Sequence, residues 1–172
     1  MDKERLDEKV TVRGVIFLIL TILGLFGLFV LMVNIGEDKT PATYEQVYNT
    51  LEQYKCDAND STEQYLEAYP NIGLKYVISA RNTDFLFDYY EFETTDDAYG
   101  AYQKLNAGIN ENFSRDAIET GGDMRNYIIH TYLYDNEYYY LMKVDNTVLY
   151  CESSEANKAL VNDIAHTLGY YQ

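Results

Sequence analysis

The chain has 172 residues, 47% of them hydrophobic, and a formal net charge of −15 at pH 7. This length suffices for one globular domain and an anchor but excludes two large domains, since single domains commonly run to about 100–200 residues. The negative charge repels nucleic acid and anionic lipid headgroups. We therefore expect no nucleic-acid partner.

An uncharged apolar run lies near the N-terminus. Residues 14–33 read GVIFLILTILGLFGLFVLMV, in which Thr21 is the only polar side chain. A helix of this length would be roughly 30 Å long, which is about the thickness of the hydrocarbon core of a bilayer. We predict one transmembrane helix over residues 14–35, between an inner tail (1–13) and a tether (36–43).

A cleaved secretory signal is the alternative for this run, because it lies at the start of the chain. Signal cores usually contain about 7–15 apolar residues and end at small residues that the peptidase recognises. The apolar run is longer, and Val33-Asn34-Ile35-Gly36 lacks the small-x-small cleavage pattern. The sequence therefore predicts an uncleaved signal-anchor.

The basic residues around the run predict its orientation. Four Lys or Arg side chains precede it, whereas only Lys39 occurs among the twenty residues that follow it. Lys and Arg are retained on the cytoplasmic side of single membrane spans. We expect a single-pass protein of the cell membrane with a cytoplasmic N-terminus and an extracellular C-terminal domain.

The first element after the tether is a helix. Apolar residues from Tyr44 to Tyr54 recur at the spacing of one helix face, and Thr43 followed by Gln46 forms a capping box at its start. Ser61 to Tyr69 predicts a short second helix, which ends at Pro70 because proline cannot continue a helix.

From Leu74 the hydrophobic period changes to two, which is the period of a strand. Asp135-Asn136 and Asp145-Asn146 separate the later strands and suit tight hairpin turns. Gly121-Gly122 indicates a break between the two groups of strands. Five strands are predicted, at residues 74–80, 84–92, 124–134, 137–144 and 147–151.

Two further helices flank the second group of strands. Thr94–Asp97 place capping hydroxyls and carboxylates at the start of one helix. Ser153 or Ser154 caps the other, which ends at Gly169. A mostly antiparallel sheet of about five strands, covered by helices, accommodates this order of elements. The sequence therefore predicts an α+β domain over residues 44–172, preceded by the transmembrane helix.

The sequence contains no motif of a catalytic, cofactor or metal site. The two histidines, His130 and His166, lack a cysteine or carboxylate at ligand spacing. Neither a serine-nucleophile motif nor a glycine-rich phosphate loop occurs. The acidic segment 57–61 has the oxygen-rich spacing of a calcium loop but not its central glycine or closing glutamate. A solvated acidic surface is the preferred interpretation, and we expect no catalytic residue, cofactor or metal.

Two cysteines, Cys56 and Cys151, fall in the predicted outer domain, where disulfides persist. A disulfide between them would close a loop of about 95 residues and stabilise the fold by roughly 4–5 kcal/mol before strain. Cys56 ends the first helix and Cys151 ends the last strand, so packing of that helix on the sheet could bring them together. Two alternatives stay open, a disulfide or two separate buried thiols.

Tyrosine is the most unusual feature of the composition. All 19 tyrosines follow the apolar run, and the chain has no tryptophan. Adjacent tyrosines in DYYEF and EYYYLMK must face opposite sides of the sheet. Cross-strand packing is the simpler explanation. An exposed aromatic surface for a glycan or a partner protein is the alternative, for which Tyr89, Tyr138 and Tyr140 are the candidates.

From Thr43 to Tyr170 the chain resembles a loose group of uncharacterised extracytoplasmic domains of Gram-positive bacteria, which are anchored by a membrane helix or a lipid. The resemblance lies in the early helix, in FDYYEFETTDDAYGAY (87–102), in the hairpin Met142–Tyr150 and in Leu168–Tyr170. It implies an α+β fold and a location in the cell envelope. It carries no assigned activity and no functional residue.

These observations favour a non-enzymatic, membrane-anchored outer domain of unknown molecular activity. We expect it to bind or sense an envelope protein or a glycan at the cell surface, as a binding or interaction module. The alternative is a cell-envelope hydrolase that uses acidic residues. Such an enzyme would need two carboxylates that converge in a cleft with separated proton affinities.

Overall fold

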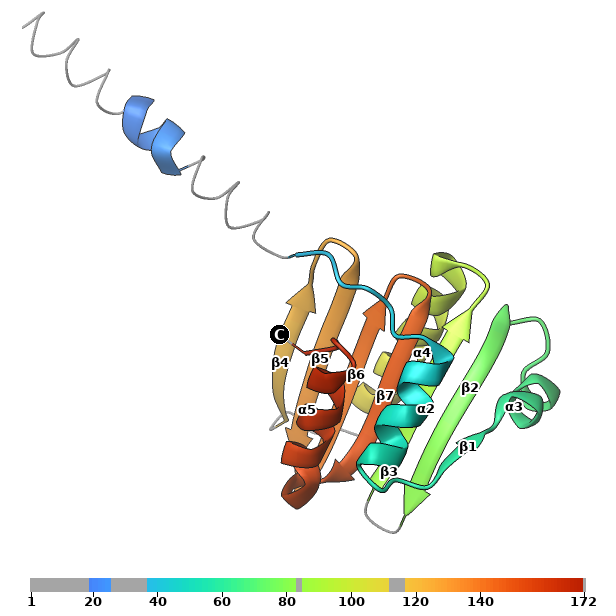
Figure 1. The fold of residues 1–172 in the computed structure, drawn as a ribbon. Helices are drawn as coiled ribbons and strands as arrows, with labels where there is room; N and C mark the ends of the chain where they lie inside the picture. Colours follow the sequence, from blue (N-terminus) through green and yellow to red (C-terminus); the bar gives the residue numbers. More distant parts are fainter. Residues whose placement is uncertain (1–18, 26–36, 83–84, 112–116, 172) are drawn as a thin grey trace, which may run out of the picture. The chain divides into compact units, whose positions relative to one another are not determined.

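The chain divides into two compact units. In the computed structural model these are Met1–Glu37 and Asp38–Gln172. The second unit contains the whole sheet and the helices labelled α2 to α5 in Figure 1. The residues that the structure describes are 19–25, 37–82, 85–111 and 117–171.

One antiparallel sheet forms the centre of the second unit. Within the described residues it has seven strands in the order β1-β2-β3-β7-β6-β5-β4. The central strands are therefore β3, β7 and β6, and the two edges are β1 and β4. The strands are β1 (Ala58–Asp60), β2 (Leu74–Asn82), β3 (Phe85–Phe92), β4 (Ile118–Asp123), β5 (Tyr127–Tyr134), β6 (Glu137–Val144) and β7 (Thr147–Ser154).

Helices cover both faces of the sheet. Helices α2 and α5 lie on one face, which we call the α5 face, and α4 lies on the opposite face, the α4 face (Figure 1). Each face has its own buried cluster of apolar side chains, and burying them supplies most of the driving force for folding. The helices are α2 (Tyr44–Gln53), α3 (Thr62–Ala68), α4 (Thr95–Glu111), the 3₁₀ turn η1 (Glu155–Asn157) and α5 (Lys158–Thr167).

Local sequence signals explain where several elements begin and turn. The Gln46 N–H donates to the Thr43 hydroxyl at 3.3 Å, and the Thr43 N–H donates to Gln46 Oε1 at 2.8 Å, which completes the capping box. Asp135 and Asn136 have φ of 49° and 66°, the left-handed pair that a two-residue hairpin requires. The first helix, the hairpins and the α+β class are confirmed.

The expected number of strands is wrong, because the structure adds β1 and β4 to the five predicted. β1 falls within the acidic segment 57–61, and β4 contains Gly121-Gly122, which was interpreted as a break. Both are edge strands, and most of their residues are exposed. β4 is exposed along most of its length, and β1 has only three residues, of which Ala58 alone is buried. The alternation of apolar and polar residues that reveals a half-buried strand is therefore absent from both.

The predicted transmembrane helix lies mostly outside the described residues. Of residues 14–35 the structure describes 19–25, which are helical and whose Leu and Ile side chains are at least 50% exposed. In the described parts of the chain no helix combines the length and the apolar character that a bilayer crossing requires. The inner tail (1–13) also lies outside the described residues.

Part of the predicted tether (36–43) belongs to the folded unit, which starts at Asp38. The Lys39 N–H donates to Asn126 Oδ1 at 3.0 Å, and Asn126 Nδ2 donates to the Lys39 carbonyl at 2.7 Å. Ala42 is buried in the core of the α5 face. Hydrogen bonds and burial thus hold this segment to the sheet, and the domain begins earlier than predicted.

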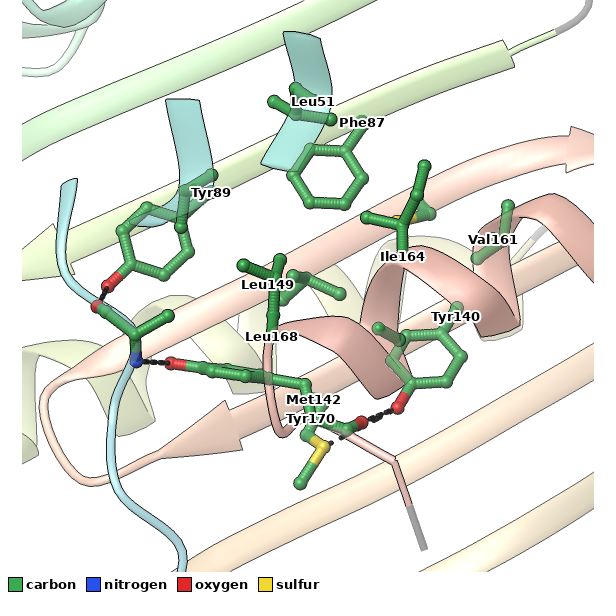
Figure 2. Packing of buried hydrophobic residues seen from close by; sticks show 14 of the residues in the cluster. Leu51, Phe87, Tyr89, Tyr140, Met142, Leu149, Val161, Ile164, Leu168 and Tyr170 are labelled. Atoms are coloured by element: carbon green, nitrogen blue, oxygen red, sulfur yellow. Dashed lines mark hydrogen bonds between the residues drawn. The ribbon is translucent and has the colours of Figure 1, made fainter. Parts of the chain in front are cut away.

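Three buried tyrosines join the two ends of the domain to the sheet (Figure 2). The Tyr89 hydroxyl donates to the Ala42 carbonyl, and the Ala42 N–H donates to the Tyr170 hydroxyl at 3.3 Å. The Tyr170 hydroxyl also bonds to the Thr147 hydroxyl, and the Tyr140 hydroxyl donates to the Tyr170 carbonyl. The hydroxyls of Tyr89, Tyr140 and Tyr170 therefore each have the partner that a desolvated hydroxyl requires.

Candidate functional site

A groove lies on the α5 face, beside α5. Helix α5 packs on β7 and α2 packs on β2, whereas β4 is the edge strand beyond β6 and β5. Figure 1 shows that neither α2 nor α5 lies in front of β4. The groove occupies this uncovered corner, between α5 and the β4–β5 pair.

The groove has a volume of about 230 Å³. This is below the roughly 300–1,000 Å³ of sites for drug-sized ligands, so it suits a single side chain or sugar ring. Its floor comes from three strands, and its wall comes from α5 and the C-terminal segment. The lining residues are Thr120, Gly121, Ile129, Thr131, Tyr138, Tyr140, Lys158, Asn162 and Tyr171.

Tyr138 links the floor of the groove to its wall. Its hydroxyl donates to Asn162 Oδ1 at 2.8 Å, and Lys158 Nζ lies 5.2 Å from its ring centroid, within the range of a cation–π interaction. Burial, together with the nearby Cys151 and Tyr171, raises the pKa of Tyr138 above its ordinary value. The hydroxyl therefore stays protonated at neutral pH and fixes the position of the Asn162 side chain.

Two neighbouring glycines shape β4, and Gly121 is one of the residues that line the groove. Gly121 has a φ of +151°, and a Cβ there would overlap the Ile129 carbonyl oxygen, so this position requires glycine. Gly122 pairs with Ile129, whose side chain lies in the core of the α5 face. A Cβ at Gly122 would meet no atom within 4 Å. On the α5 face of β4, Thr120 therefore contributes to the lining of the groove, and the next position on that face, Gly122, has no side chain.

The structure buries the three tyrosines that were candidates for an exposed aromatic surface. Tyr89 and Tyr140 are 0% exposed and Tyr138 is 3% exposed. The prediction of a solvent-facing surface at these positions is wrong, because helices cover both faces of the central strands. Tyr138 and Tyr140 do come together in the floor of the groove, whereas Tyr89 binds Ala42 elsewhere in the same core.

The structure holds Cys56 and Cys151 as separate thiols. Cys151 is fully buried in the core of the α5 face, and the half-buried Cys56 packs against the same core. Burial raises the pKa of both thiols. Both therefore stay protonated at neutral pH, and neither has the activated thiolate that a catalytic cysteine needs.

A second polar group lies on the α4 face, where β4 pairs with β5. His130 Nδ1 is 2.7 Å from Glu119 Oε1 and 3.2 Å from the Tyr132 hydroxyl, which also donates to Asn106 Oδ1 at 2.5 Å. Burial raises the pKa of Tyr132 to about 12. Across the described residues, no group of three or more His, Cys, Asp or Glu could hold a metal ion. These contacts tie the edge strand to its neighbour.

A third polar group surrounds Asp88 on the α4 face. Its Oδ2 accepts hydrogen bonds from the Tyr65 and Tyr90 hydroxyls at 3.0 and 3.1 Å, and Arg81 Nη2 lies 3.6 Å away. Asp88 Oδ1 and Oγ of the facing Ser79 are buried and have no hydrogen-bond partner within the described part of the chain. Tyr65 belongs to α3, so this carboxylate joins α3 to the sheet.

The residues of the groove were mostly missed in the sequence. Lys158 and Asn162 are four residues apart, which places them on one side of a helix, and this spacing was the available signal. Gly121-Gly122 was noticed as a break but not as part of the strand beside the groove. Tyr171 gave no signal, because only the tertiary fold brings the C-terminal segment to β4.

Binding is the chemistry that the groove supports. Its described lining offers aromatic rings, hydroxyls, an amide and an ammonium group, but no carboxylate or thiol. Polar groups of this kind in an aromatic pocket orient a ligand without transferring protons to it. No known protein family, no curated protein and no solved structure matches the chain.

Proposed function

We propose that the protein is a non-enzymatic binding module of the bacterial cell envelope, anchored by one N-terminal transmembrane helix with its folded unit outside the cell. The apolar run and the basic residues before it support the anchor and its orientation. The resemblance to envelope domains of Gram-positive bacteria supports the same location. An anchored module meets its partner at high effective concentration, so that moderate affinity suffices.

The groove beside α5 is the single observation that supports a binding role. It is a small concave site beside α5, and aromatic and polar side chains converge in it. The Tyr138–Asn162 hydrogen bond fixes part of its wall before any ligand arrives. Such pre-organisation lowers the entropy cost of binding.

A cell-envelope hydrolase that uses acidic residues is the alternative. In the described lining of the groove there is no carboxylate, whereas a glycosidase needs two that flank the bond it cleaves. Glu119 and Asp123 lie near each other, but they flank His130 on the opposite face of the sheet. No specific observation favours the enzyme, so we propose the binding module.

Photo-crosslinking in intact cells tests the binding role. A photoreactive phenylalanine analogue replaces Tyr171, which is 42% exposed and lines the groove. In the matched control the same analogue replaces Tyr69, which is 57% exposed and directly follows α3. We expect irradiation to give a discrete covalent adduct, with a protein or a glycan, from position 171 and not from position 69.

The opposite result would contradict the proposal. If positions 171 and 69 give the same adducts, or if neither gives any, the groove is not a binding site in the cell. Fluorescence or circular dichroism of both variants would first establish that each is folded, so that a negative result reflects the absence of a partner.

A further inference from the structure

Strand β4 is an open edge of the sheet. Among the described residues it pairs only with β5, and five of its six residues are exposed. Natural proteins usually protect such edges with lysine, proline, a bulge or a covering element. The sequence of β4, IETGGD, has neither lysine nor proline. No strand in the described part of the chain pairs with its outer side, so its outward backbone groups are available there to another strand.

The groove lies on the α5 face directly beside this edge. A strand added along β4 would run about 4.8 Å from it and direct every second side chain toward the α5 face. Gly122 has no side chain on this face, and a Cβ there would enter open space. One side chain of the added strand could thus cross β4 beside Thr120, which lines the groove, and enter the groove between β5 and α5.

The other face of the edge is acidic. Glu119 pairs with Tyr132 and Asp123 pairs with Ile128, so both carboxylates lie on the α4 face. Their side chains are 50% and 76% exposed. The domain as a whole has a large excess of Asp and Glu over Lys and Arg. A strand that presents basic side chains to this face would complement these charges.

A second copy of the chain fits this edge poorly. An antiparallel pair of β4 strands centred on Gly121 would place Glu119 of each copy opposite Asp123 of the other, and like charges directly opposite destabilise a strand pair. The net charge of −15 on each chain adds to the repulsion. Charge complementarity therefore favours a basic partner over self-association.

We propose that β4 is the docking edge for an extended, basic segment of a partner protein, which adds to the sheet as a further antiparallel or parallel strand. Its basic side chains lie on the α4 face beside Glu119 and Asp123, and one of its alternate side chains fills the groove beside α5. This inference rests on the proposed function, because it names the partner class of the same groove.

Calorimetric titration of the full chain in detergent micelles tests the proposal. The probe is a peptide of about eight residues in which lysine and valine alternate, long enough for one strand. A peptide of the same sequence with alternate backbone amides methylated cannot complete the ladder. We expect the first peptide to bind and to slow amide exchange in β4 about tenfold, and the methylated peptide to bind at least about tenfold more weakly.

Two pairs of variants locate the binding. Gly122→Val adds a side chain to the α5 face of β4 next to the groove, whereas Gly100→Ala adds a methyl group in open space on α4. Asp123→Asn removes one negative charge from β4. Its control, Glu67→Gln, removes one negative charge from α3 and leaves β4 unchanged. We expect Gly122→Val and Asp123→Asn to weaken binding about three- to tenfold, and both controls to leave it unchanged.

Several outcomes would overturn the inference. If the methylated peptide binds as tightly as the first peptide, strand addition is excluded. If Asp123→Asn and Glu67→Gln weaken binding equally, the peptide is attracted by the net charge of the domain and not by β4. No binding of either peptide would also refute it. If position 171 then crosslinks to a glycan in cells, the proposed function stands without this partner. If position 171 gives no adduct, the proposed function fails with it.

Discussion

Gly121 and Gly122 are neighbours in β4, yet the structure imposes opposite requirements on them. At Gly121 the positive φ and the close Ile129 carbonyl exclude any side chain, whereas Gly122 faces open space. We predict that Gly121→Ala destabilises the domain by at least about 2 kcal/mol. Gly122→Ala should change the free energy of unfolding by less than about 1 kcal/mol. Urea unfolding of both variants tests this, and equal losses would refute the assigned register of β4.

Tyr170 and Tyr171 also differ only in their surroundings. Tyr170 is fully buried, and its hydroxyl binds the Ala42 N–H and the Thr147 hydroxyl, whereas Tyr171 is 42% exposed. Tyr170→Phe leaves the buried Ala42 N–H without this acceptor and removes one of the two hydrogen bonds of the Thr147 hydroxyl, which should cost about 1–3 kcal/mol of stability. Tyr171→Phe should stay within about 0.5 kcal/mol of the parent. Thermal unfolding of both variants measures how much the Tyr170 hydroxyl stabilises the domain. Similar unfolding midpoints for Tyr170→Phe and Tyr171→Phe would contradict the buried hydrogen bonds of Tyr170.

At the scale of elements, one buried carboxylate is among the groups that hold α3 to the sheet, beside the Val77 N–H that donates to Thr62 Oγ1 at 2.9 Å. None of its own residues is buried, and Tyr65 reaches Asp88 through its hydroxyl. Asp88→Ala removes this acceptor. We predict that the amides of α3 then exchange roughly five- to tenfold faster, while those of β3 and β7 change little. Hydrogen exchange followed by mass spectrometry measures these exchange rates. A uniform increase in the exchange rate over the whole domain would contradict a local role for Asp88.

Elements with local signals were predictable from the sequence. The capping box at Thr43 and Gln46 and the left-handed turn at Asp135-Asn136 act within a few residues, so their chemistry is visible in the sequence. β1 and β4 lack such signals, since pairing with β2 and β5 alone makes them strands. Edge strands of this kind are defined by tertiary contacts and not by their own pattern.

The faces of the tyrosine-rich strands were predictable only in part. Tyr89 and Tyr90 do lie on opposite faces of the sheet, as the alternation requires. Which face meets solvent could not be read from alternation, because both faces are covered over β3, β6 and β7. The groove was hidden for a related reason, since it depends on where α5 and the C-terminal segment end relative to β4.

At the scale of the whole domain, buried tyrosines make stability sensitive to alkaline pH. Burial raises the pKa of Tyr132 and Tyr170 to about 12 and raises those of Tyr89, Tyr90, Tyr140 and Tyr150 from the ordinary 10.0. The folded state therefore keeps protons that the unfolded chain releases near pH 10. Stability is intact below that pH and falls as pH rises above it, by up to about 1.4 kcal/mol per pH unit for each such tyrosine.

Denaturant unfolding between about pH 8 and pH 11, with tyrosinate absorbance recorded in parallel, measures this dependence. We expect a constant unfolding midpoint up to about pH 9.5 and a steep fall above it, with most tyrosinate appearing as the domain unfolds. Full ionisation of all tyrosines near pH 10 in a domain that stays folded would show that these hydroxyls are not buried.

We propose that the chain crosses the membrane once and presents its folded unit outside the cell. A membrane-impermeant maleimide tests it on intact cells with Glu67→Cys, an exposed position of α3, and with Lys3→Cys in the predicted inner tail. The parent chain, in which Cys151 is buried and Cys56 is half-buried, gives the background labelling to be subtracted. We predict that Glu67→Cys is labelled in intact cells and Lys3→Cys only after lysis, with both chains in the membrane pellet. Labelling of Glu67→Cys only after lysis, or recovery of the chain in the supernatant, would contradict the account.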